Sequence, residues 1–242
     1  MRAQALPFDG PLPDPAQGVF ETTLVTGGRP VALEAHLARL EASLAALYGS
    51  AVPVGARAQV AEAAAGLELG RLRLTVGSDG ASSVRVASVD PALVFPTDGI
   101  AVTPIAVPGG IGPHKWADRR LLDQAGEQVG PAVPLVVDAE DGAVLESSRG
   151  SLFVVREGVV VTPPADGRLL PGITRTQAIE VVRGLGVELH EGAVDLAAVD
   201  EVFMTGAVRG VEPVASCEGV AAWDSGELTA RVAAELRALW LS

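Results

Sequence analysis

A single lysine stands out among the residues of this chain that could do chemistry. Lys115 lies in the segment GPHKWADRR, between a Pro- and Gly-rich loop and an expected helix, and the other seventeen basic residues are arginines. A lysine amine becomes a nucleophile when burial and neighbouring cations lower its pKa, which an arginine cannot do. The alternative is a surface lysine in an arginine-rich composition, and the position taken alone slightly favours that alternative.

Two other ionisable side chains stand in unusual local settings. Glu146 ends an expected strand and precedes a turn of small residues, so its carboxylate could pair with a heterocyclic nitrogen or be an ordinary solvated glutamate. Arg39 lies one residue before Leu40 on a leucine-rich helix, where its side chain could reach inward or extend along the surface. The sequence leaves both pairs of alternatives open.

Two short segments could bind an anion. Residues 172–174 (Gly-Ile-Thr) open an expected helix, where free backbone N–H groups and a hydroxyl form a ready phosphate site. Ordinary capping of the helix by Thr174 is the commoner use of such a segment. Residues 205–207 (Thr-Gly-Ala) close a strand with a small turn, which could offer backbone donors to an anion or simply end the strand.

Several common catalytic motifs are absent from the chain. It contains no Gly-x-Ser-x-Gly elbow, no Walker loop, no Gly-x-Gly-x-x-Gly and no His-Glu-x-x-His. These absences argue against hydrolase, P-loop and dinucleotide-binding functions.

The composition predicts a folded globular protein. The chain has 242 residues, enough for one large or two modest domains, and 48% of them are hydrophobic while 20% are charged. Its net charge of −12 has the wrong sign for a surface that binds nucleic acid or an anionic membrane. We therefore expect neither kind of partner.

Cysteine and histidine are too sparse for a disulfide or a structural metal site. The chain has one cysteine, Cys217, and three histidines, so we expect no internal disulfide and no metal. The N-terminal segment lacks the apolar core of a signal peptide, and no stretch approaches the roughly 20 apolar residues that span a bilayer. We expect a cytoplasmic protein.

The N-terminal part of the chain predicts a small α+β unit. Leucines at spacings of three and four predict one helix with a buried face over residues 31–48, ended by Gly49. Two strands are expected around a Gly-Gly turn within residues 18–31, and two more at residues 71–76 and 82–89.

The stretch at residues 96–112 is rich in Pro and Gly, flanks one short apolar strand and is the best candidate for a domain junction. We therefore expect a small N-terminal α+β domain at residues 1–95 and a larger C-terminal domain at residues 96–242. In the larger domain we expect helices at residues 117–129, 169–186 and 228–241, and strands at residues 134–139, 143–147, 151–157, 159–164 and 201–208.

Taken in order, these pieces resemble the class IV pyridoxal-phosphate aminotransferases, the family of branched-chain and D-amino-acid aminotransferases and of 4-amino-4-deoxychorismate lyase. The resemblance spans nearly the whole chain. It rests on five motifs that recur together: GVFET followed by Leu-x-x-His-Leu-x-Arg-Leu at 33–40, the lysine before a helix, Glu-x6-Phe at 146–153, LPGITR, and the late TGAV-x-x-V-x-PV.

The resemblance implies a mixed α+β and α/β fold of two domains, of the D-amino-acid aminotransferase type, with pyridoxal phosphate bound between the domains of a homodimer. Lys115 would carry the cofactor and act as the catalytic base, and Glu146 would pair with the pyridine nitrogen to make the ring an electron sink. The residues that would hold the phosphate or lie beside it are Arg39, Gly172, Ile173, Thr174, Thr205, Gly206 and Ala207.

Within the family the local sequence favours the lyase, which would convert 4-amino-4-deoxychorismate to 4-aminobenzoate and pyruvate in folate synthesis. KWADRRLL resembles the lyase pattern Lys-x-x-Asn-Arg-Leu, and Ala207 stands where the branched-chain enzymes usually carry a hydroxyl residue. The alternatives are an aminotransferase for D- or branched-chain amino acids and, from another class, a binding protein that keeps the fold without turnover.

Some positions depart from the family pattern. Ser151 and Asp118 replace asparagines, and residues 77–80 replace an Arg-Gly loop that often contributes to carboxylate binding. The missing carboxylate contacts could come from three arginines, or these arginines could lie on the surface; they are Arg119, Arg120 and Arg149.

Overall fold

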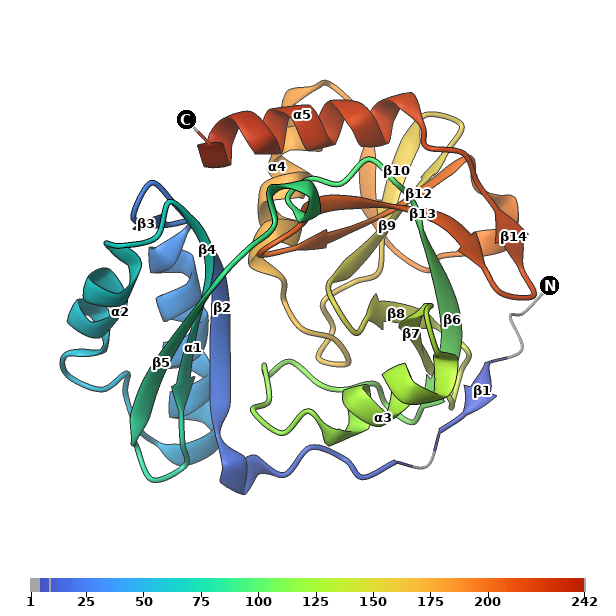
Figure 1. Ribbon diagram of the computed structural model, residues 1–242. Helices are drawn as coiled ribbons and strands as arrows, with labels where there is room; N and C mark the ends of the chain where they lie inside the picture. The colour runs from blue at the N-terminus through green and yellow to red at the C-terminus, as the bar shows by residue number, and fades with distance from the viewer. Residues whose placement is uncertain (1–4, 9, 242) are drawn as a thin grey trace.

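The computed structural model describes residues 5–8 and 10–241, and these residues form two β-sheets with helices packed against them (Figure 1). The smaller sheet is antiparallel with the strand order β3-β2-β4-β5. Its strands are β2 (Val19–Thr26), β3 (Arg29–Pro30), β4 (Leu69–Val76) and β5 (Ser82–Ser88), and the helices that cover one of its faces are α1 (Leu33–Tyr48) and α2 (Ala56–Ala64).

The local patterns of the N-terminal part form the elements that they predict. Gly27 and Gly28 both have positive φ, which suits the tight turn between β2 and β3. The leucine stripe buries Leu37, Leu40 and Leu44 of α1 against the sheet. Gly49 then ends the helix in the left-handed conformation and donates its N–H to the carbonyl of Ala45.

The larger sheet contains a closed ring of strands. Strand β6 pairs in parallel with both β7 and β13, while β8, β9 and β12 connect these two by antiparallel pairs. The strands of this sheet are β1 (Leu6–Pro7), β6 (Ile100–Val107), β7 (Val133–Asp138), β8 (Val144–Ser147), β9 (Ser151–Arg156), β10 (Val159–Thr162), β11 (Leu189–Glu191), β12 (Glu201–Gly206), β13 (Gly210–Cys217) and β14 (Ala221–Ala222).

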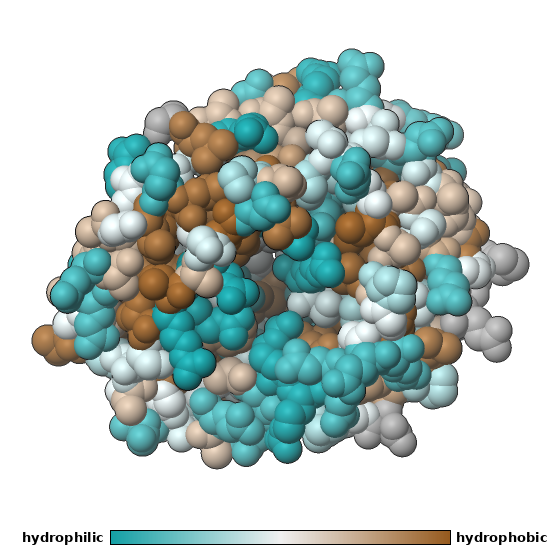
Figure 2. All heavy atoms as spheres, viewed as in Figure 1, coloured by the Kyte–Doolittle hydropathy of each residue, from teal (hydrophilic) through white to brown (hydrophobic). Residues whose placement is uncertain are grey.

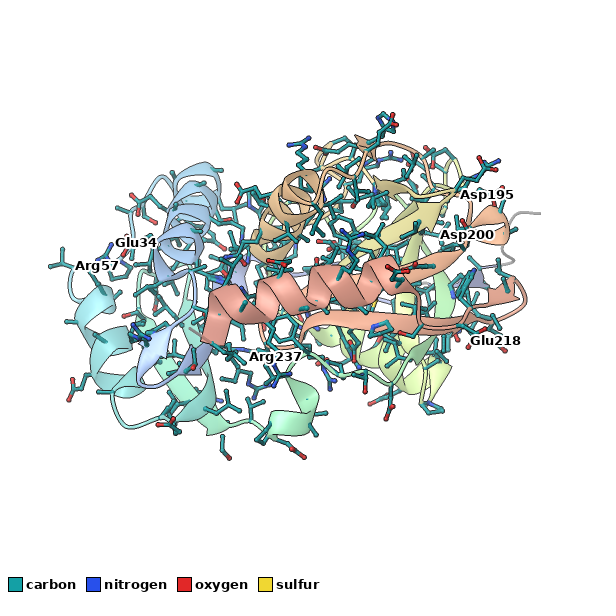
Figure 3. The ribbon with its side chains drawn as sticks, turned by 90° about the horizontal axis from the view of Figure 1, so that it is seen from above. Glu34, Arg57, Asp195, Asp200, Glu218 and Arg237 are labelled. Atoms are coloured by element: carbon teal, nitrogen blue, oxygen red, sulfur yellow. The ribbon has the colours of Figure 1, made fainter. Side chains whose placement is uncertain are left out.

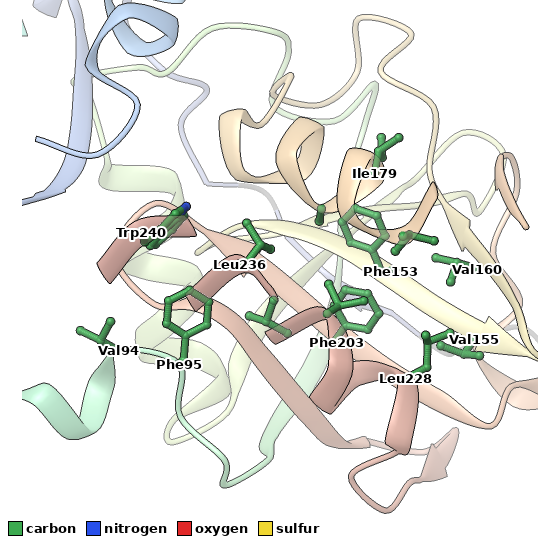
Figure 4. Packing of buried hydrophobic residues seen from close by; sticks show 14 of the residues in the cluster. Val94, Phe95, Phe153, Val155, Val160, Ile179, Phe203, Leu228, Leu236 and Trp240 are labelled. Carbon is green, nitrogen blue, oxygen red and sulfur yellow. The ribbon is translucent and has the colours of Figure 1, made fainter. Parts of the chain in front are cut away.

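Aromatic and aliphatic side chains join this ring to two long helices. Helices α4 (Ile173–Gly184) and α5 (Glu227–Leu241) pack beside each other, and α3 (Arg120–Val129) lies near the other end of the ring (Figure 1). Phe153 of β9 and Phe203 of β12 stack with ring centroids 5.0 Å apart, and Trp240 of α5 meets Phe95 edge to face (Figure 4). Strands β9 and β12, which carry site residues at their ends, are thereby held in a well-packed core.

Several elements differ from the sequence prediction. Helix α3 begins at Arg120 rather than at residue 117, because the preceding residues pair with β2: Ala117 donates its N–H to the carbonyl of Gly18. Helix α4 begins at Ile173, so residues 169–172 lie before it. Helix α2 and strand β13 were not predicted, since the buried face of α2 is mostly alanine and β13 contains a glutamate and a proline.

The chain leaves the smaller sheet at Ser88 and enters the larger one at Ile100. The predicted domain boundary at residues 95 and 96 falls between these points, and we propose that each sheet defines one domain. Leu6–Pro7 pairs with β6, so this N-terminal segment contacts the larger sheet. Among the described residues no helix is long and apolar enough to cross a membrane, and no cluster of three or more His, Cys, Asp or Glu side chains could hold a metal ion.

Candidate active site

All nine residues that the resemblance assigns to the cofactor site line one pocket. It lies between the two sheets, where the space-filling view shows a hollow bordered by hydrophilic residues (Figure 2). The nine are Arg39, Lys115, Glu146, Gly172, Ile173, Thr174, Thr205, Gly206 and Ala207.

Backbone pairing with β2 fixes the position of Lys115. Phe20 donates its N–H to the carbonyl of Lys115 at 2.9 Å, and Trp116 forms an isolated antiparallel bridge with Val19. The amine of Lys115 lies 5.0 Å from the centroid of the Phe20 ring. A lysine that could have been a surface residue is therefore half-buried and held against the smaller sheet.

The surroundings of Lys115 leave more of its amine unprotonated near neutral pH than in an ordinary lysine. Its pKa is lowered from 10.5 to about 8, mainly by burial and also by the nearby charges of Arg39 and Arg119, while Glu21 and Glu146 act in the opposite direction. A substantial fraction of the amine is consequently neutral near physiological pH, which a nucleophile or general base requires.

Glu146 is buried at the end of β8 and is not the solvated strand-end residue that the sequence also allowed. Its Oε1 accepts the N–H of Leu170 at 3.1 Å. Burial raises its pKa from 4.5 to about 7, although this hydrogen bond and the nearby Lys115 act in the opposite direction. A carboxyl group in this state can exchange a proton with a basic nitrogen placed beside it.

Sheet register places Glu146 in a row with two hydroxyl residues. Ser151 of β9 lies directly opposite Glu146 on one side and opposite Thr205 of β12 on the other. The hydroxyl of Thr205 is buried and has no hydrogen-bond partner among the described residues. This row brings segments that are far apart in the sequence to the same wall of the pocket.

Arg39 does not lie along the surface, because a buried carboxylate holds it. Its Nε and Nη2 donate to the two carboxylate oxygens of Glu21 at 2.8 and 2.7 Å, and its Nη1 donates to the carbonyl of Pro171 at 2.9 Å. His36 Nδ1 lies 2.7 Å from Oε2 of the same glutamate. This bidentate pair orients the guanidinium toward the segment before α4.

Glu21 is ionised although it is buried. Burial alone would raise its pKa, but hydrogen bonds with His36 and Arg39 lower it to about 2. Sequence reasoning missed this residue. The available signal was a glutamate within a strand whose neighbouring residues are all suited to burial.

Replacing Glu21 by Gln is expected to lower the free energy of unfolding by roughly 3 kcal/mol at pH 7, because Arg39 and His36 lose their buried carboxylate. The folded-state pKa of Glu21 lies below its ordinary value, so its contribution is complete above pH 4.5 and is lost as the pH falls toward 2. Denaturant titrations of wild type and Glu21→Gln across this range measure the contribution.

A matched control for this experiment is Glu34→Gln. Glu34 pairs with Arg57 on the outside of the smaller sheet, where both side chains are exposed (Figure 3). Solvent screens this pair, so its loss should leave stability unchanged within error.

The difference in free energy of unfolding between wild type and Glu21→Gln should shrink as the pH falls below 4.5. A difference that stays constant would contradict the ionised state assigned to Glu21.

The N-terminus of α4 is open to the pocket. Gly172 is the residue before the helix, no side chain caps it, and Thr174 lies buried inside the first turn. Capping by Thr174, the other interpretation of this segment, is therefore wrong. A Cβ atom on Gly172 would lie 2.6 Å from the hydroxyl oxygen of Ser151, so only glycine fits here without a shift. The first helical N–H groups lack intrahelical partners and suit an anion.

The three arginines considered for carboxylate binding separate into two groups. Arg119 and Arg149 line the pocket. Arg120 is bound instead to the buried carboxylate of Asp118, through Nη2 at 2.6 Å and through Nε. Asp118 also accepts the N–H of Asp14 at 2.9 Å. The aspartate that replaces an asparagine thus fixes the segment that follows Lys115, and Arg120 does not line the pocket.

These residues form a donor set suited to pyridoxal phosphate. An amine with a lowered pKa and a buried carboxyl group line the same pocket. A guanidinium, an open helix N-terminus and the Thr205 hydroxyl provide donors for a phosphate. Three of the five N–H groups of Arg39 are used in the hydrogen bonds described above, which leaves two for a ligand.

The family model for class IV aminotransferases matches residues 18–108 and 115–217, and the second segment begins at the reactive lysine. This chain belongs to the class IV aminotransferase family. It is therefore a pyridoxal-phosphate-dependent enzyme with the fold of this family, as the sequence resemblance predicted.

Solved structures of other proteins support the class IV fold over almost the full chain. A hypothetical aminotransferase from Mycobacterium tuberculosis is 24% identical, with 93% of this chain and 89% of that chain covered and a TM-score of 0.82. The 4-amino-4-deoxychorismate lyase from Pseudomonas aeruginosa is 25% identical, with 92% and 91% covered and a TM-score of 0.73.

Among curated sequences, this member of the class IV aminotransferase family is 36% identical over 97 residues to the branched-chain-amino-acid aminotransferase of Escherichia coli K12. That match spans 38% of this chain and only 31% of the Escherichia coli enzyme. Lyases and aminotransferases thus both occur among the relatives, and the specific reaction has to be inferred from the site.

Proposed function

We propose that this enzyme is a lyase that converts 4-amino-4-deoxychorismate to 4-aminobenzoate and pyruvate, a step of folate synthesis. The observation that carries the proposal is the placement of Arg119. It lies in the segment that resembles the lyase pattern after the lysine, lines the pocket and is close enough to Lys115 to lower the pKa of the amine. A cation at this position suits a substrate with carboxylates.

The residues that the resemblance assigns to the cofactor site have distinct roles in this proposal. Arg39, the start of α4 and residues 205–207 hold the phosphate of the cofactor, and Glu146 holds a proton at the pyridine nitrogen. When bound, pyridoxal phosphate supplies an electron sink for the substrate carbon attached to nitrogen.

Lys115 then moves the proton that starts the reaction. Its amine removes the proton from the substrate carbon attached to nitrogen, and the electron pair left behind expels enolpyruvate as the ring becomes aromatic. Protonation of enolpyruvate yields pyruvate, and 4-aminobenzoate would leave when the Lys115 amine takes its place on the cofactor. The pKa of about 8 suits this role, because the same amine can accept and return a proton near neutral pH.

An aminotransferase for D- or branched-chain amino acids is the second candidate. The local identity of 36% to a branched-chain enzyme favours it. Ala207 argues against it, since this wall of the pocket offers a methyl group where those enzymes usually carry a hydroxyl. In both cases we propose that the enzyme is a cytoplasmic homodimer.

The deciding experiment supplies 4-amino-4-deoxychorismate to the cofactor-loaded enzyme without any keto acid. We expect fluorescent 4-aminobenzoate and pyruvate to form in equal amounts over many turnovers. Product that forms only when a keto acid is added would instead identify an aminotransferase. A protein that takes up no added cofactor and stays colourless would show that the fold persists without turnover.

A further inference from the structure

A second cavity adjoins the pocket on the side of the smaller sheet, and its wall is rich in arginine. The cavity has a volume of about 450 Å³ and shares Lys115 and Arg119 with the pocket. Strand β4 alternates, so that Leu72 and Leu74 pack against α1 and α2 while Arg71 and Arg73 line the cavity. A cavity of this size is suited to a small organic ligand.

Part of this positive charge is neutralised by the protein itself. Glu212 lies 3.0 Å from Arg209 and 3.6 Å from Arg149, so these two cavity arginines have a carboxylate partner. Arg71, Arg73 and Arg119 have no such partner within ion-pairing distance among the described residues. The cavity therefore keeps an excess of positive charge next to the reactive amine.

Arg73 is the cavity arginine whose charge and hydrogen-bonding groups are least compensated by neighbouring side chains. Its Nε is buried and has no hydrogen-bond partner in the part of the chain that the structure describes. The same is true of the hydroxyl of Thr22, which lies directly opposite it on β2. On its other side Arg73 faces Arg85 of β5, an arrangement of like charges that destabilises a sheet. Burial and the neighbouring arginines lower the pKa of Arg73.

The Phe20 ring lies close to both Arg73 and Lys115. The guanidinium carbon of Arg73 lies 4.2 Å from the centroid of this ring, and the amine of Lys115 lies 5.0 Å from the same centroid. One small molecule can therefore reach both cations.

We propose that Arg73, assisted by Thr22 and Arg71, binds a second carboxylate of the substrate, remote from the amine that reacts at Lys115. The substrate class is thus an amino dicarboxylate, and an amino acid with an apolar side chain is a poor ligand. This inference rests on the proposed function in one respect, that an amino substrate reacts at Lys115. It holds for a lyase acting on 4-amino-4-deoxychorismate, which carries two carboxylates, and for an aminotransferase acting on an acidic amino acid.

The test compares two probes that differ by one carboxylate, isophthalate and benzoate, on the cofactor-loaded enzyme. Calorimetric titration should show that wild type binds isophthalate at least about tenfold more tightly than benzoate, as expected for a charge-assisted hydrogen bond. Arg73→Gln should lose most of this preference, and Arg73→Lys should recover part of it. Arg85→Gln is the matched control, because Arg85 lies directly opposite Arg73 on β5 but does not line the cavity. This variant should keep the wild-type preference for isophthalate.

Stability separates a binding role from a structural one. Arg73→Gln should melt no lower than wild type, since it removes a charge from a crowded positive face. A loss of several degrees would make Arg73 a structural residue and overturn the proposal, as would an unchanged preference for isophthalate in Arg73→Gln.

The outcomes also separate this inference from the proposed function. If no 4-aminobenzoate forms but Arg73→Gln abolishes the isophthalate preference, the lyase assignment fails and the dicarboxylate site stands. If 4-aminobenzoate forms with the same KM in wild type and Arg73→Gln, the lyase stands and the role of Arg73 is refuted.

Discussion

Lys115→Ala is expected to abolish turnover, with a decrease in kcat/KM of at least about 10³-fold, because one substitution removes both the nucleophile and the general base. The measurement is steady-state product formation together with borohydride reduction and peptide mapping. Since Lys115 is the only lysine among 242 residues, a cofactor fixed to a lysine side chain by borohydride can have only one attachment site. The variant should carry no such modification.

Lys115→Arg is the matched control for this experiment. It keeps a cation beside the Phe20 ring but offers no amine that can be neutral near pH 7. We expect it to be as inactive as Lys115→Ala, which would assign the effect to nucleophile and base chemistry rather than to lost charge. Substantial activity in either variant would refute the role of Lys115.

The second large effect is expected for Glu146→Gln, which should lower kcat by about 100-fold with a smaller change in KM. A neutral amide cannot keep a proton on the pyridine nitrogen, so the electron sink is weaker. Because the sink acts when charge develops in the transition state, its loss lowers kcat more than it changes KM. Kinetics at saturating cofactor measure this effect. Glu146→Asp, which keeps the charge on a shorter side chain, should recover part of the activity.

The same substitution should stabilise the protein in the absence of cofactor. The folded-state pKa of Glu146 is raised from 4.5 to about 7, so its ionisation costs stability as the pH rises through this range. Glu146→Gln should therefore unfold at a higher denaturant concentration than wild type at pH 8, and the two should coincide below pH 4.5.

A distant glutamate serves as control for both effects. Glu218 accepts a hydrogen bond from Thr103 and lies far from the pocket at the edge of the larger sheet (Figure 3). Glu218→Gln should leave kcat unchanged and should not reproduce the rise in stability at pH 8. A loss of activity without the gain in cofactor-free stability would show that Glu146 is not held in a desolvated site.

The correct and incorrect predictions of the fold have a common origin. Helix α1 and strands β4 and β5 follow from apolar periodicity, which depends only on neighbours along the chain. The start of α3 could not be predicted, because residues 115–117 are kept out of the helix by hydrogen bonds to β2, which lies almost a hundred residues earlier. Strand β13 was missed for a related reason, since its glutamate is tolerated only because Arg209 and Arg149 lie beside it.

The sequence by itself determined which residues line the pocket, because motifs such as LPGITR record local geometry at a helix start or a strand end, and the resemblance of these motifs to a known family implied the cofactor. Only the tertiary structure decided the chemical state of these residues. Glu21 orients Arg39 from another element, burial moves the pKa values of Lys115 and Glu146 toward neutrality, and the register of β4 turns Arg73 toward the reactive amine. The physical reason is that desolvation and charge pairing depend on neighbours in space, which no spacing along the chain specifies.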